Sequence, residues 1–299
     1  MKTAFNSLNE SAPSLALATA RSFLFVPANR PERFAKALAS GADAVIIDLE
    51  DAVSAAQKAS AREQLTGVFV QSALVDRSRL VVRMNADGTP WAEDDLILLQ
   101  TLVAQGLTGV MVPKAECADA LERLCVSLGS RCALLPQIES VAGLDCVDAL
   151  ASAPQVLRLV FGNLDFQADV GLTCAPDEAE LVPVRLALVM ASRRAGLVAA
   201  AVDGVTLGTQ DSAQLRADAA RSRRGGFGAK LCIHPAQVAA VNAAFTPSAG
   251  ELEWAQRVMQ GYQASGGGVF NLDGRMVDAP VVRLAQRTLA QAQRNAAAG

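Results

Sequence analysis

The chain is poor in the residues that zinc and redox motifs need. It contains a single histidine, His234, and its six cysteines form no C-x-x-C pair. A structural zinc site needs closely spaced cysteine and histidine ligands, so the common zinc motifs are excluded. Scattered cysteines in a chain of 299 residues are typical of free thiols in a cytoplasmic protein, and we expect that location.

Long apolar runs and a basic stripe are also missing. No run is long enough to cross a bilayer, and residues 1–20 lack the continuous apolar segment of a secretory signal. There are 27 Lys and Arg residues against 30 Asp and Glu residues, which gives a net charge of −3. Domains that bind nucleic acid usually carry a basic stripe, so we expect neither nucleic acid nor a membrane as a partner.

Short apolar runs, in contrast, are plentiful. Hydrophobic residues make up 51% of the chain and charged residues 19%, which is enough for a large core. After Arg21, eight such runs alternate with helical stretches, and they are continuous rather than alternating in polarity. This is typical of a parallel sheet that is buried on both faces. The runs are residues 22–27, 44–49, 80–84, 109–113, 133–138, 157–161, 199–202 and 230–233.

The stretches between these runs predict helices. Four are expected over residues 30–40, 91–105, 117–128 and 178–195. Asn29 would cap the first of them, and Pro183 is a possible interruption of the last. Eight repeats in this length favour an α/β fold of the (β/α)8 TIM-barrel type. A doubly wound open sheet is the alternative, although no GxGxxG or P-loop motif follows the first strand.

The two ends of the chain differ from the repeats. Residues 1–20 are rich in Ser, Ala and Asn and are expected to form a flexible tail. The barrel is expected over residues 21–248. Residues 249–299 contain two helical stretches separated by a glycine-rich break. We expect them to form a C-terminal helical extension that packs on a neighbouring subunit.

Two acidic residues at the ends of consecutive apolar runs indicate a site. Glu139 follows the fifth run and Asp165 follows the sixth. In a parallel α/β protein the carboxyl ends of the strands face the active site. Two carboxylates there would hold a hard divalent cation, and Mg²⁺ is the expected cofactor. The structural alternative for either residue alone is a helix N-cap.

Other polar residues are expected at the same end of the barrel. Arg83 could stabilise a developing enolate oxygen beside a bound cation, which suits cleavage or formation of a carbon–carbon bond next to a carbonyl. Glu50, Asp51 and Lys114 are interpreted as groups that orient Arg83 and the waters of the metal. His234 follows the last strand and has either a structural role or a place in the pocket wall.

The segment after the first strand is basic. Arg30, Arg33 and Lys36 lie near an expected helix N-terminus, where cations oppose the helix dipole. A bound phosphate would compensate this repulsion and would accept backbone N–H groups. The alternative is a solvated helix face, because Glu32 balances part of the charge.

Eight segments in order make the chain similar to the citrate lyase β-subunit-like family of the HpcH/HpaI aldolase superfamily. The resemblance covers about residues 21–290. The segments are FLFVPANRP (23–31), IDLEDAV (47–53), VRMN (82–85), VPKAE (112–116), QIES (137–140), FGNLDF (161–166), KLCIHPAQ (230–237) and DGRMVDAP (273–280). The resemblance implies a (β/α)8 barrel and Mg²⁺-dependent lyase chemistry on acyl-CoA thioesters such as citryl-CoA or malyl-CoA.

The resemblance also implies roles for individual residues. Glu139 and Asp165 would bind Mg²⁺. Arg83 would bind the substrate carbonyl and stabilise the enolate, with Glu139 also touching the substrate. Asp278 would be the proton-transfer group, carried on a C-terminal segment that reaches the active site of an adjacent subunit. The enzyme would then be a homo-oligomer, a trimer or a hexamer.

Three residues match family positions that contact coenzyme A, namely Phe25, Arg30 and Lys36. Two other functions stay open beside the acyl-CoA lyase. One is a class II aldolase that acts on a free keto acid. The other is a carrier-dependent lyase subunit that is active only in a complex.

Overall fold

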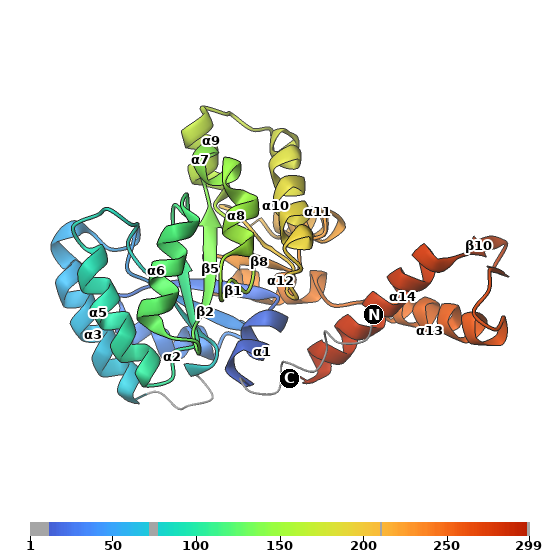
Figure 1. The fold of residues 1–299 in the computed structure, drawn as a ribbon, viewed down its shortest axis with the longest axis horizontal. Coiled ribbons are helices and arrows are strands. Elements are labelled where there is room, and N and C mark those ends of the chain that lie inside the picture. The colour runs from blue at the N-terminus through green and yellow to red at the C-terminus, as the bar shows by residue number, and fades with distance from the viewer. Residues whose placement is uncertain (1–11, 72–76, 210, 298–299) are drawn as a thin grey trace. The chain divides into compact units, whose positions relative to one another are not determined.

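The computed structural model describes residues 12–71, 77–209 and 211–297. The chain divides into two compact units, with the division between Asn242 and Ala243. The first unit holds a closed barrel of eight parallel strands in chain order (Figure 1). The strands are β1 (Ser22–Pro27), β2 (Ala44–Asp48), β3 (Leu80–Arg83), β4 (Gly109–Val112), β5 (Ala133–Ile138), β6 (Val160–Phe161), β7 (Val202–Asp203) and β8 (Ala229–Cys232).

Strand β1 pairs in parallel with both β2 and β8, and this pairing closes the barrel. The predicted (β/α)8 barrel is therefore confirmed, and the open sheet is excluded. Alternate residues of each strand point inward and fill the interior, as in other barrels of this type. The inward side chains include Phe23, Ile46, Val81, Met111, Leu135, Val160 and Leu231.

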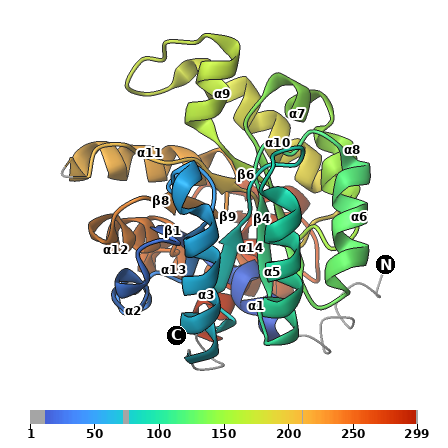
Figure 2. The same cartoon turned by 90° about the vertical axis from the view of Figure 1, so that its left-hand side faces the viewer.

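Helices surround the barrel (Figure 2). They are α2 (Phe34–Leu38), α3 (Lys58–Gln71), α5 (Ala92–Ala104), α6 (Ala118–Leu128), α7 (Val141–Asp145), α8 (Val147–Ser152), α9 (Asn163–Val170), α10 (Val182–Arg194), α11 (Ser212–Arg224) and α12 (Pro235–Ala244). In the described part of the chain, short 3₁₀ turns accompany them at η1 (Pro31–Arg33), η2 (Ala55–Gln57) and η3 (Ala179–Leu181). In α6 the buried residues recur at helical spacing, as the sequence predicts.

Residues 12–20 differ from the expected flexible tail. They form helix α1 (Ala12–Thr19), whose Leu17 is fully buried in the cluster that fills the barrel. The guanidinium of Arg158 donates hydrogen bonds to the carbonyl oxygens of Leu17 and Ala20 at 3.1 and 2.9 Å. Burial of an apolar side chain outweighs the loss of chain entropy here. Residues 1–11, the rest of the expected tail, lie outside the described residues.

Two helix boundaries also differ from the prediction. The helix expected over residues 30–40 begins with the turn η1, and the Asn29 side chain donates to Gln57 at 3.0 Å instead of capping a helix. Pro183 lies in the first turn of α10, where a proline removes no helical hydrogen bond, so it does not interrupt the helix.

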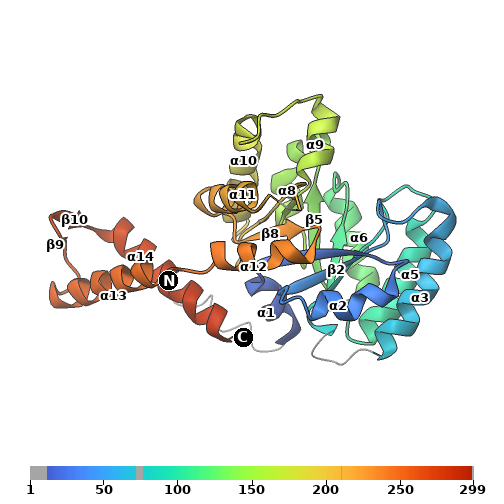
Figure 3. The ribbon, with the colours of Figure 1, turned by 180° about the vertical axis from the view of Figure 1, so that it is seen from behind.

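The second unit is a helical hairpin with a small sheet (Figure 3). Its elements are α13 (Ala249–Ala264), β9 (Phe270–Leu272), β10 (Arg275–Val277) and α14 (Ala279–Ala297). Ala255 and Val258 of α13 pack with Val282 and Ala285 of α14. None of the described helices in either unit is both long enough and apolar enough to span a membrane.

Candidate active site

A cleft of about 740 Å³ opens at the carboxyl ends of the strands. Its walls come from the first βα turn and from the residues that end the strands. The polar and aromatic lining residues are Phe25, Arg33, Lys36, Asp48, Asp51, Arg83, Gln137, Asn163, Asp165 and His234. Five of the predicted site residues therefore line one cleft, namely Phe25, Lys36, Asp51, Arg83 and Asp165.

Arg83 ends β3 and is held rigidly. Its Nε and Nη2 atoms donate to the two carboxylate oxygens of Asp48, each at 2.7 Å, and Nη1 lies 2.9 Å from Glu50 Oε2. The guanidinium also lies over the ring of Phe25, 4.8 Å from its centre. Burial alone would lower the pKa of Arg83, but the charges of Asp48, Glu50 and Glu139 raise it. Arg83 is a fixed cation at the cleft.

Lys114 connects Glu50 to Glu139. Its ammonium lies 2.5 Å from Glu50 Oε1, and its backbone N–H donates to Glu139 Oε1 at 2.7 Å. Lys114 has a φ of 47°, a left-handed conformation that is uncommon for a residue other than glycine. The hydrogen bond to Glu139 is made by the N–H of this left-handed residue. Asp51 lines the cleft and is exposed.

Glu139 is a buried carboxylate that is only partly neutralised. Its side chain is 3% exposed, and Oε2 accepts no hydrogen bond from any residue that the structure describes. Burial, and then the negative charges of Asp165 and Glu50, raise the pKa of Glu139 to about 8, against the opposing effects of the Lys114 N–H and Arg83. The cost of this arrangement would fall if a cation bound between Glu139 and Asp165.

Gly162 makes room for the Glu139 carboxylate. A Cβ atom at Gly162 would lie 2.4 Å from Glu139 Oε2, closer than any real contact. Helix α9 begins directly after this glycine. Asp165 lies in its first turn and lines the cleft. The carboxylates of Glu139 and Asp165 offer only oxygen ligands, which fit a hard, oxygen-preferring cation. Within the described residues no group of three or more His, Cys, Asp or Glu side chains is arranged to hold a metal ion, so a cation bound by Glu139 and Asp165 would keep open positions.

The basic residues of the first turn differ in their positions relative to the cleft. Lys36 and Arg33 line the cleft, although only Lys36 was expected to bind coenzyme A. Arg30 is exposed and its Nε lies 2.7 Å from Glu32 Oε1, so part of its charge is balanced by Glu32. At this rim the cleft therefore presents two cations, Lys36 and Arg33, with a third close by in sequence.

His234 and Asp278 occupy different units. His234 lines the cleft, and its Nδ1 accepts the N–H of Ala236 at 3.2 Å. Asp278 lies in the second unit at the start of α14, where its Oδ1 accepts the N–H of Val281 at 3.4 Å.

Sequence reasoning did not assign roles to Asp48, Gln137 and Asn163. Asp48 is the main partner of Arg83, and strand register could have indicated it, because the two residues are directly paired across β2 and β3. Gln137 lies two residues before Glu139 and so faces the same way. Its buried Oε1 accepts no hydrogen bond from the described residues. The contacts of Asn163 depend on a distant loop and carry no sequence signal.

Comparisons with known proteins identify the family of the chain. The sequence model of the HpcH/HpaI aldolase/citrate lyase family matches residues 21–235. The chain belongs to this family. It is 36% identical over 277 residues to a citrate lyase subunit beta-like protein of Mycobacterium tuberculosis. The aligned residues cover 90% of this chain and 94% of the relative. It is 32% identical over 280 residues to a (3S)-malyl-CoA thioesterase of Cereibacter sphaeroides, covering 93% and 96%.

A solved structure supports the same family assignment. The CitE protein of Mycobacterium tuberculosis in complex with magnesium, acetoacetate and coenzyme A aligns with a TM-score of 0.78 at 36% identity. The alignment covers 92% of this chain and 99% of that protein. The predicted family and the predicted class of enzyme, a lyase related to the citrate lyase β subunit, are both confirmed.

Proposed function

We propose that the protein is a Mg²⁺-dependent carbon–carbon lyase. It would cleave a short 3-hydroxyacyl-CoA with a distal carboxylate, such as malyl-CoA or citryl-CoA, into an acyl-CoA and a keto acid. The observation that carries the proposal is the incompletely neutralised Glu139 carboxylate beside Asp165, within the electrostatic reach of Arg83. The related CitE protein supports it, because that protein is complexed with magnesium and coenzyme A.

Glu139 and Asp165 would hold the cation. Each offers carboxylate oxygens, and Glu139 Oε2 is buried and uncommitted. A bound Mg²⁺ would polarise the oxygens of the keto-acid part of the substrate. Glu50, Asp51 and Lys114 are proposed to orient the surroundings. For Lys114 and Glu50 this agrees with the contacts that tie Arg83 to Glu139.

Arg83 would stabilise the negative charge that develops on the thioester oxygen. When the bond between C2 and C3 breaks, C3 becomes the carbonyl carbon of the keto acid, and its hydroxyl proton passes to the proton-transfer group, which then returns a proton to C2. The electron pair of the broken bond remains on the acyl-CoA fragment as an enolate. The double ion pair with Asp48 fixes the guanidinium in advance, so little reorganisation is needed as this charge forms.

The enolate then takes a proton at C2. Asp278 is the proposed proton-transfer group. It belongs to the second unit, and the resemblance implies that this segment reaches the active site of an adjacent subunit. The proposal therefore includes a homo-oligomer, a trimer or a hexamer, in which residues 249–299 pack on a neighbouring subunit.

The coenzyme A portion would extend toward the first turn. Phe25 and Lys36 line that side of the cleft, and Arg30 is in the same turn. The ammonium and guanidinium groups suit phosphate oxygens. All six cysteines lie in described stretches and are free thiols, which supports a reducing, cytoplasmic location.

Purified protein incubated with malyl-CoA and citryl-CoA, with and without Mg²⁺, tests the proposal. We expect Mg²⁺-dependent release of glyoxylate or oxaloacetate together with acetyl-CoA. Release of free coenzyme A without acetyl-CoA would instead indicate thioester hydrolysis, the activity in the name of the 32% identical relative. No turnover of either thioester would contradict the proposal.

Two further experiments distinguish the acyl-CoA lyase from the two other candidate functions. A class II aldolase on a free keto acid would be unaffected by Arg30→Ala combined with Lys36→Ala, whereas the acyl-CoA lyase would show a KM raised about tenfold or more. A strictly carrier-dependent subunit would not turn over free acyl-CoA and would become active only with an acyl carrier protein.

A further inference from the structure

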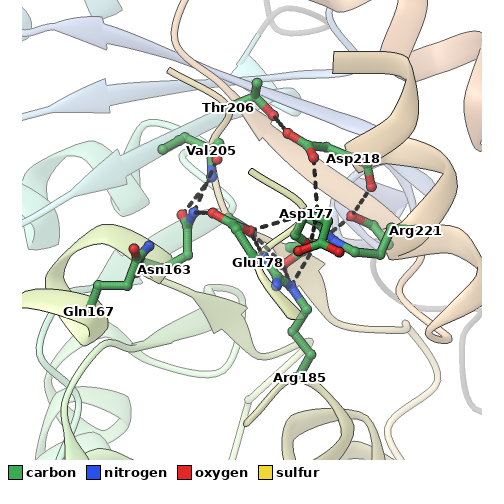
Figure 4. A network of polar contacts seen from close by, with 12 residues as sticks. Asn163, Gln167, Asp177, Glu178, Arg185, Val205, Thr206, Asp218 and Arg221 are labelled. Atoms are coloured by element: carbon green, nitrogen blue, oxygen red, sulfur yellow. Dashed lines mark hydrogen bonds and ion pairs between the residues drawn. The ribbon is translucent and has the colours of Figure 1, made fainter. Parts of the chain in front are cut away.

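A second network of charged residues, some of them buried, lies beside the cleft, between the ends of β6 and β7 and helices α10 and α11 (Figure 4). Its members are mostly acidic and arginine side chains that pair with one another. They include Glu178, Arg185, Asp203, Asp218 and Arg221, with hydrogen bonds from the Ser222 hydroxyl to Asp203 and from Arg221 to the backbone carbonyl of Asp177. One neutral member, Asn163, belongs both to this network and to the cleft wall.

Glu178 is the point at which the network reaches Asn163. Its Oε2 accepts hydrogen bonds from Arg185 and, at 2.8 Å, from Arg221. Its Oε1 accepts from Asn163 Nδ2 at 3.0 Å. The backbone of Glu178 is left-handed, with a φ of 48°. A residue other than glycine persists in this conformation only where its surroundings determine it, and the two arginines do so here.

Asn163 is fixed from the other side by the loop after β7. Its Oδ1 accepts the N–H of Val205 at 2.9 Å, and its Nδ2 donates to the carbonyl of Val205 at 3.2 Å. The side chain is 1% exposed and lies so close to Gly204 that a Cβ there would be 2.0 Å from Oδ1. One amide therefore clamps three groups and has only one orientation that satisfies all of them.

Asn163 is also the first residue of α9, and Asp165 follows in the same first turn. The carbonyl of Asn163 accepts the side-chain amide of Gln167 at 3.0 Å, which ties the clamp to the second turn. Positions in one helical turn cannot move independently. Whatever fixes Asn163 therefore fixes the point from which the Asp165 carboxylate enters the cleft.

We propose that Asn163 is a positioning residue that sets the place of Asp165, with Glu178 as its anchor. This rests on the proposed function, in which Asp165 binds Mg²⁺. Residues that orient metal ligands through hydrogen bonds commonly contribute 10- to 100-fold to affinity for the metal. The clamp would hold Asp165 opposite Glu139 before the cation arrives, so that binding requires little rearrangement of α9.

A merely structural role predicts a different result, and the chain supplies a matched control. Gln237 of α12 is equally buried, at 1% exposure, and is also a clamp made by one amide. Its Oε1 accepts the N–H groups of Ile233 at 2.9 Å and His234 at 3.3 Å, and its Nε2 donates to the carbonyl of Thr206 at 2.8 Å. Gln237→Ala removes a comparable set of hydrogen bonds without touching α9.

Titration of Mn²⁺, which is visible by electron paramagnetic resonance, tests the proposal in the full-length protein without substrate. Asn163→Ala is expected to raise the Kd for Mn²⁺ by about 10- to 100-fold. Gln237→Ala is expected to change that Kd by less than about twofold, while both variants lower Tm. Equal Kd values for wild type and Asn163→Ala would overturn the proposal, as would an equal loss in Gln237→Ala.

Two further variants keep the test decisive if Asn163→Ala fails to fold. Gly204→Ala displaces the Asn163 side chain and should raise the Kd in the same way. Asn163→Asp keeps the shape but replaces the donor that faces Glu178 by an acceptor, so it should also weaken binding. Wild-type affinity in both would refute the positioning role. A wild-type protein that binds no Mn²⁺ would refute the metal site itself, which is a distinguishable outcome.

Discussion

Glu139 and Asp203 are two buried carboxylates at the same end of the barrel, and their pKa values move in opposite directions. Asp203 ends β7 and is fully buried, and Glu139 follows β5 and is 3% exposed. Burial tends to raise the pKa of both groups. Even so, the pKa of Asp203 is below its ordinary value, whereas that of Glu139 is raised to about 8.

The neighbours of the two carboxylates explain the difference. Asp203 faces the charges of Lys230 and Arg185, and it accepts hydrogen bonds from Arg185 at 2.9 Å and from Ser222. Glu139 faces the negative charges of Asp165 and Glu50. The protein thus neutralises Asp203 internally and leaves Glu139 to be neutralised from outside. The first arrangement supports the fold, and the second is what a cation site requires.

Replacing Asp165 should give the largest effect on function. Asp165→Ala removes one of only two carboxylates proposed to hold the cation, so Mg²⁺ binding should be lost and turnover should fall by about 10³-fold or more. Metal titration and steady-state kinetics check both. Unchanged Mg²⁺ affinity would show that Asp165 is not a ligand. It would also contradict the interpretation that Glu139, unlike Asp203, is neutralised by a bound cation.

Asp278→Ala should separate proton transfer from metal binding. If Asp278 transfers the proton, turnover should fall by about 10²- to 10⁴-fold while Mg²⁺ affinity is unchanged. The same two measurements apply. A variant that loses metal affinity would contradict the assigned role, because Asp278 would then belong with the cation-binding carboxylates.

Asp203→Asn should damage the fold and not the metal site directly. It leaves the buried charges of Arg185 and Lys230 without their main partner, which costs about 3–5 kcal/mol of the free energy of unfolding. Urea denaturation at pH 7 measures this. A loss below about 1 kcal/mol would show that the Asp203 network contributes little to stability.

Glu139→Gln should raise the free energy of unfolding of the metal-free protein at high pH, whereas Asp203→Asn should lower it. The folded-state pKa of Glu139, about 8, lies above its unfolded-state value, so the folded state binds the proton more tightly. The stability from this proton is fully present below about pH 4.3 and is lost as pH rises toward 8.

Above pH 8 the Gln variant should therefore be more stable than wild type, by on the order of a few kcal/mol. Urea denaturation of both proteins from pH 5 to pH 9, with a chelator present, gives the difference. Parallel stability curves would contradict the raised pKa, and added Mg²⁺ should stabilise only the wild type.

Much of this molecule follows from its sequence. Continuous apolar runs predict the buried parallel strands, and strands β1 and β5 coincide with their runs. The β6 and β7 strands are shorter than their runs, because pairing along a barrel depends on neighbours that composition does not reveal. The β9–β10 hairpin was missed, although Asp273 and Gly274 carry the Asp-Gly signal of a tight turn and both have positive φ.

The site was predictable to a similar degree. Strand ends identified Arg83, Glu139 and Asp165, because polar groups after buried strands meet at one end of a barrel. The clamp on Asn163 could not be predicted, since its partners Glu178 and Val205 are 15 and 42 residues away. The close approach of Glu139 to Gly162 could not be predicted either, because it depends on the separation of two backbone segments rather than on residue type.

Calorimetric titration of Mg²⁺ into the metal-free protein tests the central claim most directly. It would be run at pH 7 in two buffers of different ionisation enthalpy, with wild type and Glu139→Gln compared. We predict that the wild type binds Mg²⁺ and releases close to one proton, because most Glu139 is protonated at this pH and must lose that proton. Glu139→Gln should bind far more weakly and release none. Equal binding by both proteins, or no binding by the wild type, would contradict the account.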